Sequence, residues 1–164
     1  MVFDLKQLFI GDNATLPVDY SLDLREMEVD QGCPFVEPVK ISGTMSNHSG
    51  VIRLSYNAEF PFRKPCDRCA VETTHRFSYA FDHILVDKLH GEDTGEYIVL
   101  EEYQLDMDEL AISDILLELP SKYLCKEDCK GLCPQCGANW NVESCSCSAK
   151  RVDPRLEILK SLIK

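Results

Sequence analysis

The residues of this chain best suited to chemistry are cysteines, and six of the nine lie in one short stretch. These six are Cys125, Cys129, Cys133, Cys136, Cys145 and Cys147. Thiols do not gather this densely in a reduced protein through packing preference alone, whereas a metal ion with thiolate ligands requires them. A disulfide cluster and a set of unbound thiols are the competing interpretations. The number and spacing of the cysteines favour a structural zinc site over both.

Cys133 and Cys136 are the predicted zinc ligands with the clearest spacing. They form a C-x-x-C knuckle, so one tight turn can bring both sulfur atoms to a single ion. Gly137 follows the second ligand and can adopt a positive φ angle without strain. A structural zinc ion takes four ligands, so six cysteines are two more than one ion needs.

The other two zinc ligands are expected from the cysteine pairs that flank the knuckle. Cys125 and Cys129 precede it, Cys145 and Cys147 follow it, and the spacing allows either pair or one residue from each. We favour Cys145 and Cys147, because the loop over residues 133–147 is then compact. A catalytic zinc usually has mixed ligands and an open position, and no histidine follows the cysteines or lies among them. We therefore expect no catalytic role for this site.

A further pair, Cys66 and Cys69, belongs to the sequence Cys-Asp-Arg-Cys. Three interpretations stay open: half of a zinc site that C-terminal cysteines complete, a redox dithiol, or a structural or recognition turn that includes Arg68. A thioredoxin-like dithiol begins a helix after a strand, and no helical periodicity surrounds these residues. We favour the turn, at the end of a hairpin.

Charge is distributed unevenly along the chain, whose formal net charge is −11. Residues 1–120 contain 9 basic and 23 acidic residues, whereas residues 121–164 contain 8 basic and 5 acidic ones. Residues 82–118, the acidic strip, contain 12 acids and one base, Lys88. An acidic body repels phosphate backbones, so nucleic-acid binding is expected at most from the cysteine-rich tail. The acidic strip either contacts a basic partner or only forms a solvated face.

The strands that position these residues are predicted from alternating apolar residues. Alternation over residues 52–60 indicates a half-buried antiparallel strand, and the polar residues 46–50 join it in a hairpin to a strand that begins at Val39. Alternation over residues 77–85 predicts another strand, and residues 97–100 a short one.

Weaker patterns describe the chain on either side of the hairpin. Residues 5–9 begin a short helix or a strand, and residues 16–24 are expected to form an edge strand. Pro61 and Pro65 are expected to interrupt strand pairing, because proline lacks a backbone N–H group.

Two helices are predicted near the C-terminal end. The first spans residues 108–119, with Asp108 as N-cap, Pro120 after its end, and acidic residues such as Asp114 on its solvent-facing sides. Its expected apolar stripe consists of Leu110, Ile112, Ile115, Leu116 and Leu119. The second spans residues 153–164 and begins with an Asp-Pro pair, which is typical of a helix start.

Together these patterns predict an α+β fold: an antiparallel β-sheet, partly open and barrel-like, with one packed helix, a cysteine-rich zinc-binding segment and a C-terminal helix. We expect an acidic β-rich core domain over residues 1–120 and the zinc-binding segment with the C-terminal helix over residues 121–164. No apolar run is long enough to span a membrane, and no signal peptide is recognisable. With an odd number of cysteines, this predicts a cytoplasmic protein.

The order of these motifs resembles the YceD family. The features are C-x-R-C after an antiparallel hairpin, an acidic stretch before an apolar helix that ends in Leu-Pro, L-C-x3-C-x-G-L-C-P-x-C-G followed by Asn139 and Asn141, then C-x-C and D-P-R-L-E-I-L. The resemblance covers about residues 39–163. Members are bacterial and plastid proteins associated with accumulation of the large-subunit ribosomal RNA, which implies a non-enzymatic role in ribosome biogenesis. Because members differ in their C-terminal cysteines, we expect the turn Cys66, Arg68 and Cys69 to be the shared element.

The sequence thus predicts a zinc-stabilised factor for large-subunit assembly. Its expected partner is a basic ribosomal protein or an rRNA-processing factor on the acidic strip, with possible contact between the basic tail and rRNA. A thiol redox protein that uses Cys66 and Cys69, and a zinc-ribbon regulator that binds nucleic acid, are the alternatives. We expect no small-molecule substrate and no enzymatic activity, because the nucleotide-binding and hydrolase motifs are absent from the sequence.

Overall fold

The computed structural model describes residues 1–11, 14–30, 32–49, 51–88, 95 and 97–147. The chain forms two compact units. The sheet unit consists of Met1–Lys64 and Thr74–Ser121, and the cysteine unit consists of Pro65–Thr73 and Lys122–Lys164. The sequence analysis divided the chain once, after residue 120, whereas the cysteine unit also includes a segment from between two strands.

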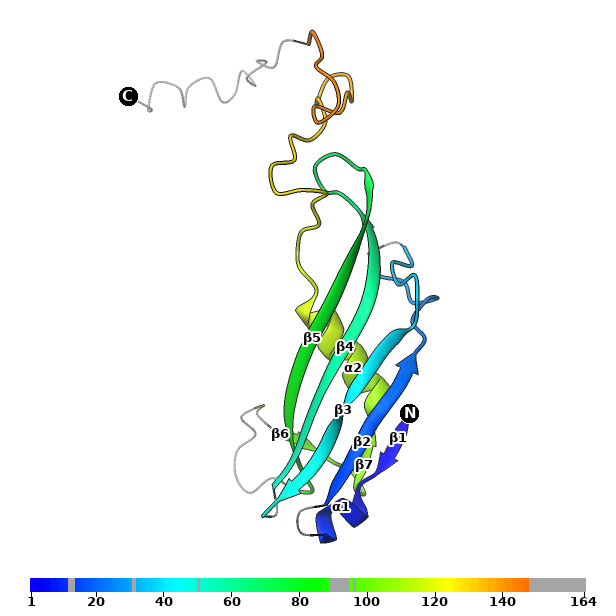
Figure 1. Cartoon of the computed structure of the whole chain (residues 1–164), viewed down its shortest axis with the longest axis vertical. Coiled ribbons are helices and arrows are strands. Elements are labelled where there is room, and N and C mark those ends of the chain that lie inside the picture. The colour runs from blue at the N-terminus through cyan, green and yellow to red at the C-terminus, as the bar shows by residue number, and fades with distance from the viewer. Residues whose placement is uncertain (12–13, 31, 50, 89–94, 96, 148–164) are drawn as a thin grey trace, which may run out of the picture. The chain divides into compact units, whose positions relative to one another are not determined.

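A five-stranded, mostly antiparallel β-sheet forms the sheet unit (Figure 1). Its strands are, in spatial order, β2 (Thr15–Leu22), β3 (Val39–His48), β4 (Val51–Pro65), β5 (Glu72–Val86) and β6 (Tyr97–Val99). Strand β6 runs parallel to β5 and pairs only with its last residues, Ile84 to Val86. The sheet is open between its edge strands β2 and β6, so the barrel-like closure expected from the sequence is not formed by these strands.

The predicted hairpin is formed by β3 and β4, and alternating side chains of β4 fill the core. Ile52, Leu54, Tyr56 and Ala58 are all buried, as the period of two requires when one sheet face is covered. The strands pair from Lys40 opposite Glu59 to His48 opposite Val51. The turn is therefore shorter than the predicted one, which spanned residues 46–50.

Pro61 and Pro65 were expected to interrupt strand pairing; the strand β4 itself continues past Pro61 and ends at Pro65. The pairs between β3 and β4 end at Glu59, so the missing N–H group of Pro61 breaks no bond of that ladder. Beyond it, Phe62 is fully buried and forms an isolated antiparallel bridge with Phe35.

The predicted helix is α2 (Met107–Glu118), and its N-cap is Asp106 rather than Asp108. The Asp106 carboxylate accepts hydrogen bonds from the backbone N–H groups of Asp108 and Glu109. The buried residues of the helix are Met107, Ala111 and Ile115. Of the predicted apolar stripe only Ile115 is fully buried, so the helix is rotated relative to the expectation.

Asp114 points into the sheet unit instead of toward solvent, with 13% of its side chain exposed. Its Oδ2 accepts a hydrogen bond from the Tyr56 hydroxyl and lies 2.7 Å from Nε2 of His83. Asp114 therefore connects α2 to β4 and β5.

The N-terminal elements are β1 (Val2–Asp4) and α1 (Lys6–Ile10), and β1 pairs with β7 (Gln104–Asp106). The helix predicted over residues 153–164 lies outside the described residues. Within the part of the chain that the structure describes, no helix combines the length and apolarity that crossing a bilayer requires.

Candidate metal centres

Eight cysteines of the cysteine unit form two separate groups of four. The first centre consists of Cys66, Cys69, Cys125 and Cys129, and the second of Cys133, Cys136, Cys145 and Cys147. Within each group, all four sulfur atoms lie within 4.8 Å of one another. The sequence analysis expected one group of four and favoured the residues that form the second centre. Cys125 and Cys129 were the less favoured pair of ligands. In the structure they form a second group of four with Cys66 and Cys69.

Two segments that are distant in sequence meet at the first centre. The turn between β4 and β5 is closed by the Cys66 N–H group, which donates to the carbonyl of Val71 at 2.9 Å. Asp67 and Tyr123 then join the turn to the second segment. The Asp67 N–H group donates to the Tyr123 carbonyl at 2.8 Å, and the Tyr123 N–H group donates to the Asp67 carboxylate at 2.6 Å.

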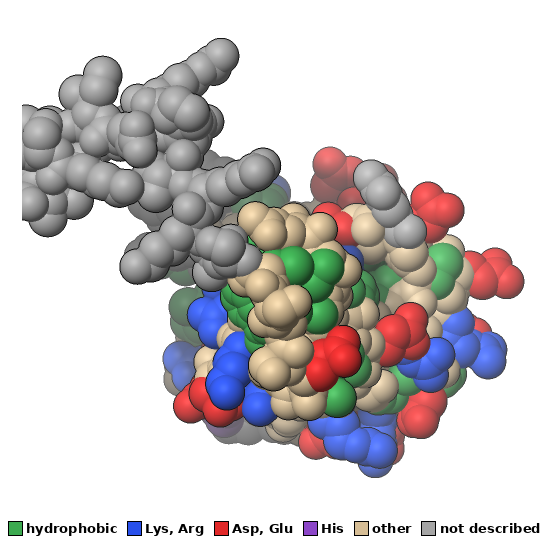
Figure 2. Space-filling model, turned by 90° about the horizontal axis from the view of Figure 1, so that it is seen from above, with side chains coloured by type: hydrophobic (Ala, Val, Ile, Leu, Met, Phe, Trp, Pro, Cys, Tyr) green, Lys and Arg blue, Asp and Glu red, His purple; other side chains and the backbone are tan. Residues whose placement is uncertain are grey.

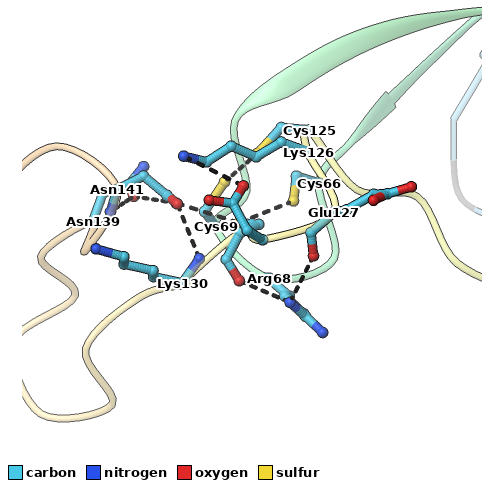
Figure 3. A network of polar contacts seen from close by, with 11 residues as sticks. Cys66, Arg68, Cys69, Cys125, Lys126, Glu127, Lys130, Asn139 and Asn141 are labelled. Atoms are coloured by element: carbon cyan, nitrogen blue, oxygen red, sulfur yellow. Dashed lines mark hydrogen bonds and ion pairs between the residues drawn. The ribbon is translucent and has the colours of Figure 1, made fainter.

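Arg68 makes a third connection between these segments (Figure 3). Its Nη1 donates to the carbonyl oxygen of Cys129 at 2.8 Å and to that of Glu127 at 3.4 Å. Both contacts hold the backbone around a cysteine of the first centre. The sequence left open whether Arg68 has a recognition or a structural role, and these contacts are of the kind that a structural role requires.

The sulfur separations of the first centre fit a tetrahedral zinc ion. Sγ of Cys66 lies 3.8 Å from Sγ of Cys129, and Sγ of Cys69 lies 3.6 Å from Sγ of Cys125. A zinc–sulfur distance of about 2.3 Å in a tetrahedron places sulfur atoms about 3.8 Å apart. A disulfide needs a separation of about 2.05 Å. All nine cysteines are described, and none forms a disulfide.

Backbone donors around the first centre favour the thiolate form that a metal ion requires. Burial opposes ionisation of Cys66, but N–H groups of Cys125, Arg68 and Cys69 lower the pKa of this thiol to about 6. Burial and the neighbouring thiols raise the pKa of Cys125 to about 12. Four adjacent thiols therefore do not ionise together without a cation that offsets their mutual repulsion.

The second centre is built on the predicted knuckle. The Gly137 N–H group donates to the Cys133 carbonyl at 2.9 Å, and Gly137 has the expected positive φ angle of 75°. N–H groups of Cys136 and Gln135 lower the pKa of the Cys133 thiol to about 6. Cys133 is buried, but Cys136 is exposed.

Two side chains that the sequence analysis did not assign to the site contact its sulfur atoms. Nδ2 of Asn141 lies 3.3 Å from Sγ of Cys129, and Nε1 of Trp140 lies 3.4 Å from Sγ of Cys145. Asn141 appeared in the sequence only as part of the family pattern. An amide that follows a C-x-x-C knuckle is a signal that can be searched for, since ligands of structural metals usually have hydrogen-bond partners.

The chemistry of both centres is that of a closed site. Each has four thiols, which suits a soft or borderline ion such as zinc and leaves no position for a substrate or water at a four-coordinate ion.

Comparison with known proteins identifies the family of this chain. The family model described as "Large ribosomal RNA subunit accumulation protein YceD" matches residues 54–163, which is more than half of the chain. The chain belongs to the YceD family. This YceD-family chain is 25% identical over 170 residues to the uncharacterized protein YlbN of Bacillus subtilis, covering 100% of this chain and 97% of YlbN.

Other relatives of this YceD-family chain occur in mycobacteria. It is 29% identical over 140 residues to the uncharacterized protein Rv2926c of Mycobacterium tuberculosis, covering 82% of this chain and 57% of that protein. The uncharacterized protein ML1660 of Mycobacterium leprae is 23% identical over 155 residues, or 87% of this chain and 69% of the relative. No solved structure matches this chain.

Proposed function

We propose that this YceD-family protein is a non-enzymatic, zinc-stabilised factor that supports accumulation of large-subunit ribosomal RNA and hence ribosome biogenesis. The observation that carries the zinc part is the arrangement of eight thiols in two groups of four, with the sulfur atoms of each group within 4.8 Å of one another. Because four thiolates fill the coordination of each ion, the metal has a structural role. The ribosomal part follows from the description of the family. A reducing cytoplasm is the compartment that suits such thiols.

A basic protein is the partner that the sheet unit suits best. The acidic strip of residues 82–118 presents seven exposed acids among its described residues: Asp82, Asp87, Glu101, Glu102, Asp106, Glu109 and Glu118. Asp114 is committed to internal contacts, so it is not available to a partner. A surface of one sign steers a partner of opposite charge and sets the salt dependence of binding. A ribosomal protein or an rRNA-processing factor with a basic surface fits this description.

Direct binding of rRNA by the cysteine unit is less favourable. Residues 65–73 and 122–164 contain nine basic and seven acidic residues. Two four-thiolate zinc centres, each with a formal charge of −2, would turn this formal charge of +2 into about −2. The face in Figure 2 shows acidic and basic side chains interspersed rather than a continuous basic patch. We therefore propose a basic protein, rather than rRNA, as the direct partner.

The redox alternative is weakened by the position of Cys66 and Cys69. A redox dithiol acts as an isolated pair with one reactive, accessible thiolate. Here both thiols are buried, with 2% and 4% of their surface exposed, and they share a centre with Cys125 and Cys129.

The first test is depletion of the protein in its host, followed by the ratio of large-subunit to small-subunit rRNA. We expect the ratio to fall and re-expression of the wild type to restore it. Failure of Cys69→Ser to restore the ratio, at equal protein level, would support the need for the first centre. A ratio that does not change on depletion contradicts the proposed function.

The partner is tested by neutralising three exposed acids of the strip and capturing the bound proteins. We expect the triple variant Glu101→Gln, Glu109→Gln and Glu118→Gln to lose basic partners, and wild-type association to weaken as salt rises. The matched control removes three exposed acids outside the strip, with Glu26→Gln, Glu28→Gln and Glu37→Gln. Equal loss in both variants shows that only net charge matters and contradicts a specific surface.

A further inference from the structure

Residues 139–141 touch one metal ligand from each centre. The side-chain amide of Asn141 donates to the sulfur of Cys129, in the first centre, at 3.3 Å. The indole N–H group of Trp140 donates to the sulfur of Cys145, in the second centre, at 3.4 Å. Two adjacent side chains thus connect the two groups of thiols.

Hydrogen bonds hold the segment in place and orient the side-chain amide of Asn141 (Figure 3). Oδ1 of Asn139 accepts bonds from the backbone N–H group of Asn141 at 3.0 Å and from its side-chain amide at 2.8 Å. Oδ1 of Asn141 accepts the N–H group of Lys130 at 2.9 Å. The Trp140 N–H group donates to the carbonyl of Gly131 at 3.0 Å. The two donors are therefore carried by one backbone segment that is held to residues 130 and 131.

The first centre also fixes the backbone that leads to the second. Three residues separate Cys129 from Cys133, and among them Gly131 has a φ angle of 79°. A Cβ atom at Gly131 would lie 3.0 Å from the carbonyl oxygen of Arg68, and the N–H group of Leu132 donates to that same oxygen at 3.1 Å. The backbone at Gly131 and Leu132, which precedes the Cys133 knuckle, thus packs directly on the turn that contains Cys66 and Cys69.

We propose that residues 139–141 couple the two centres, so that an ion bound at one centre raises the affinity of the other for its own ion. An ion bound at the first centre would fix the position of the Cys129 sulfur, which contacts the Asn141 amide. Through the shared backbone, this would hold the indole of Trp140 beside Cys145. The coupling is reciprocal, because linkage between two binding equilibria is symmetric. This inference rests on the metal-binding part of the proposed function.

The test measures the affinity of each centre with the other intact or disabled. The probes are cobalt(II) and zinc(II) added to the reduced, metal-free full chain, with bound ions counted by native mass spectrometry. Cys69→Ser disables the first centre and Cys136→Ser the second. We expect each substitution to lower the affinity of the remaining centre about tenfold, the lower end of the range for partners of metal ligands. Trp140 is the single tryptophan of the chain, so its fluorescence reports loading of the second centre.

A second set of variants assigns the coupling to residues 139–141. Asn141→Leu keeps the approximate volume of the side chain and removes its donor and acceptor. In this background we expect Cys69→Ser to leave the affinity of the second centre unchanged, because the connection is already lost. Val142→Ala is the matched control, since Val142 is the next residue and 84% exposed. It should retain the tenfold dependence.

The outcomes separate this inference from the proposed function. If two ions bind and each affinity is the same whether the other centre is intact or disabled, the coupling is wrong and the metal-binding function stands. If the tenfold dependence survives Asn141→Leu, the centres communicate by another route and the role of residues 139–141 is wrong. If the full chain binds no ion, the metal part of the proposed function fails as well.

Discussion

The sheet unit and the cysteine unit are stabilised by different interactions. The sheet unit has a core of fully buried apolar side chains, among them Leu54 and Ile115. In the described part of the cysteine unit, Tyr123 is the one buried hydrophobic residue that is not a cysteine. The described residues of the cysteine unit thus bury little apolar surface, and a metal is a common substitute for an apolar core in small folds. One chain therefore combines a unit with an apolar core and a unit whose buried described side chains are mostly cysteines.

Of the changes predicted here, metal removal should affect the stabilities of the two units most differently. With a chelator, we expect the cysteine unit to lose its structure and the sheet unit to keep it. The apparent binding free energy of a structural zinc is about 10–16 kcal/mol, and the cysteine unit has little apolar burial to replace it. Hydrogen exchange followed by mass spectrometry reports each unit separately. Protection that persists over residues 122–147 without metal would contradict this expectation.

Truncation of a core side chain should show the reverse pattern. Leu54 is completely buried in β4, so Leu54→Ala should destabilise the sheet unit by about 2–5 kcal/mol through lost burial and a cavity. Metal content should stay at the wild-type value. Denaturant unfolding and metal analysis measure the two effects. Leu117→Ala is the control, because Leu117 is 83% exposed and its truncation should be close to neutral.

Strands β3 and β4 approach closely at Gly43, where a substitution should reduce the stability of the sheet unit by less than Leu54→Ala does. At Gly43 a Cβ atom would lie 2.3 Å from the carbonyl oxygen of Ser55 and 2.5 Å from Cα of Tyr56. Gly43→Ala should therefore push β3 from β4 and cost roughly 1–3 kcal/mol, as overpacking does. Thermal unfolding gives the loss. Gly32→Ala is the control, because nothing lies within 4 Å of its added Cβ atom. A Gly43→Ala protein as stable as this control would show that the sheet accommodates the methyl group.

The cap of α2 should have the smallest effect and a defined pH dependence. Asp106→Ala should cost about 1 kcal/mol, because two backbone N–H groups lose their acceptor. The N–H groups of Glu109 and Asp108 lower the pKa of Asp106 in the folded protein. Its charge therefore contributes stability that is present above the ordinary aspartate pKa of about 3.9 and is lost as the pH falls through the lowered value. Asp106→Asn keeps an acceptor without charge, so the wild-type advantage over it should vanish at low pH. An advantage that is constant with pH would contradict this.

The sequence was sufficient where one periodic pattern decided the outcome. Five alternations over residues 52–60 predicted the strand that fills the core, and the Cys133 knuckle with Gly137 was found from spacing alone. The N-cap of α2 was misplaced by two residues because Asp106 and Asp108 both precede the same apolar run. Its buried face was missed because Met107 and Ala111 pack inside while larger leucines stay outside.

The composition of the first centre could not be predicted in the same way. Cys69 and Cys125 are 56 positions apart, and Cys66 and Cys129 are 63 apart. Spacing rules recognise ligands that share a turn, whereas the contact between two such turns depends on the strands and the helix between them. Asp67 and Arg68 make that contact through hydrogen bonds to backbone groups of the second segment, and backbone groups have no sequence signature.

The long separation between the two halves of the first centre makes a bound ion a cross-link of the chain. Closing the loop from Cys69 to Cys125 ties together the ends of a segment that includes β5, β6, β7 and α2. While the ion stays bound, the unfolded form of that segment is a closed ring with fewer conformations than a linear chain. By the relation used for disulfides, this is worth roughly 4 kcal/mol to the folded sheet. The proposed metal would therefore raise the melting temperature of a unit that holds none of its ligands.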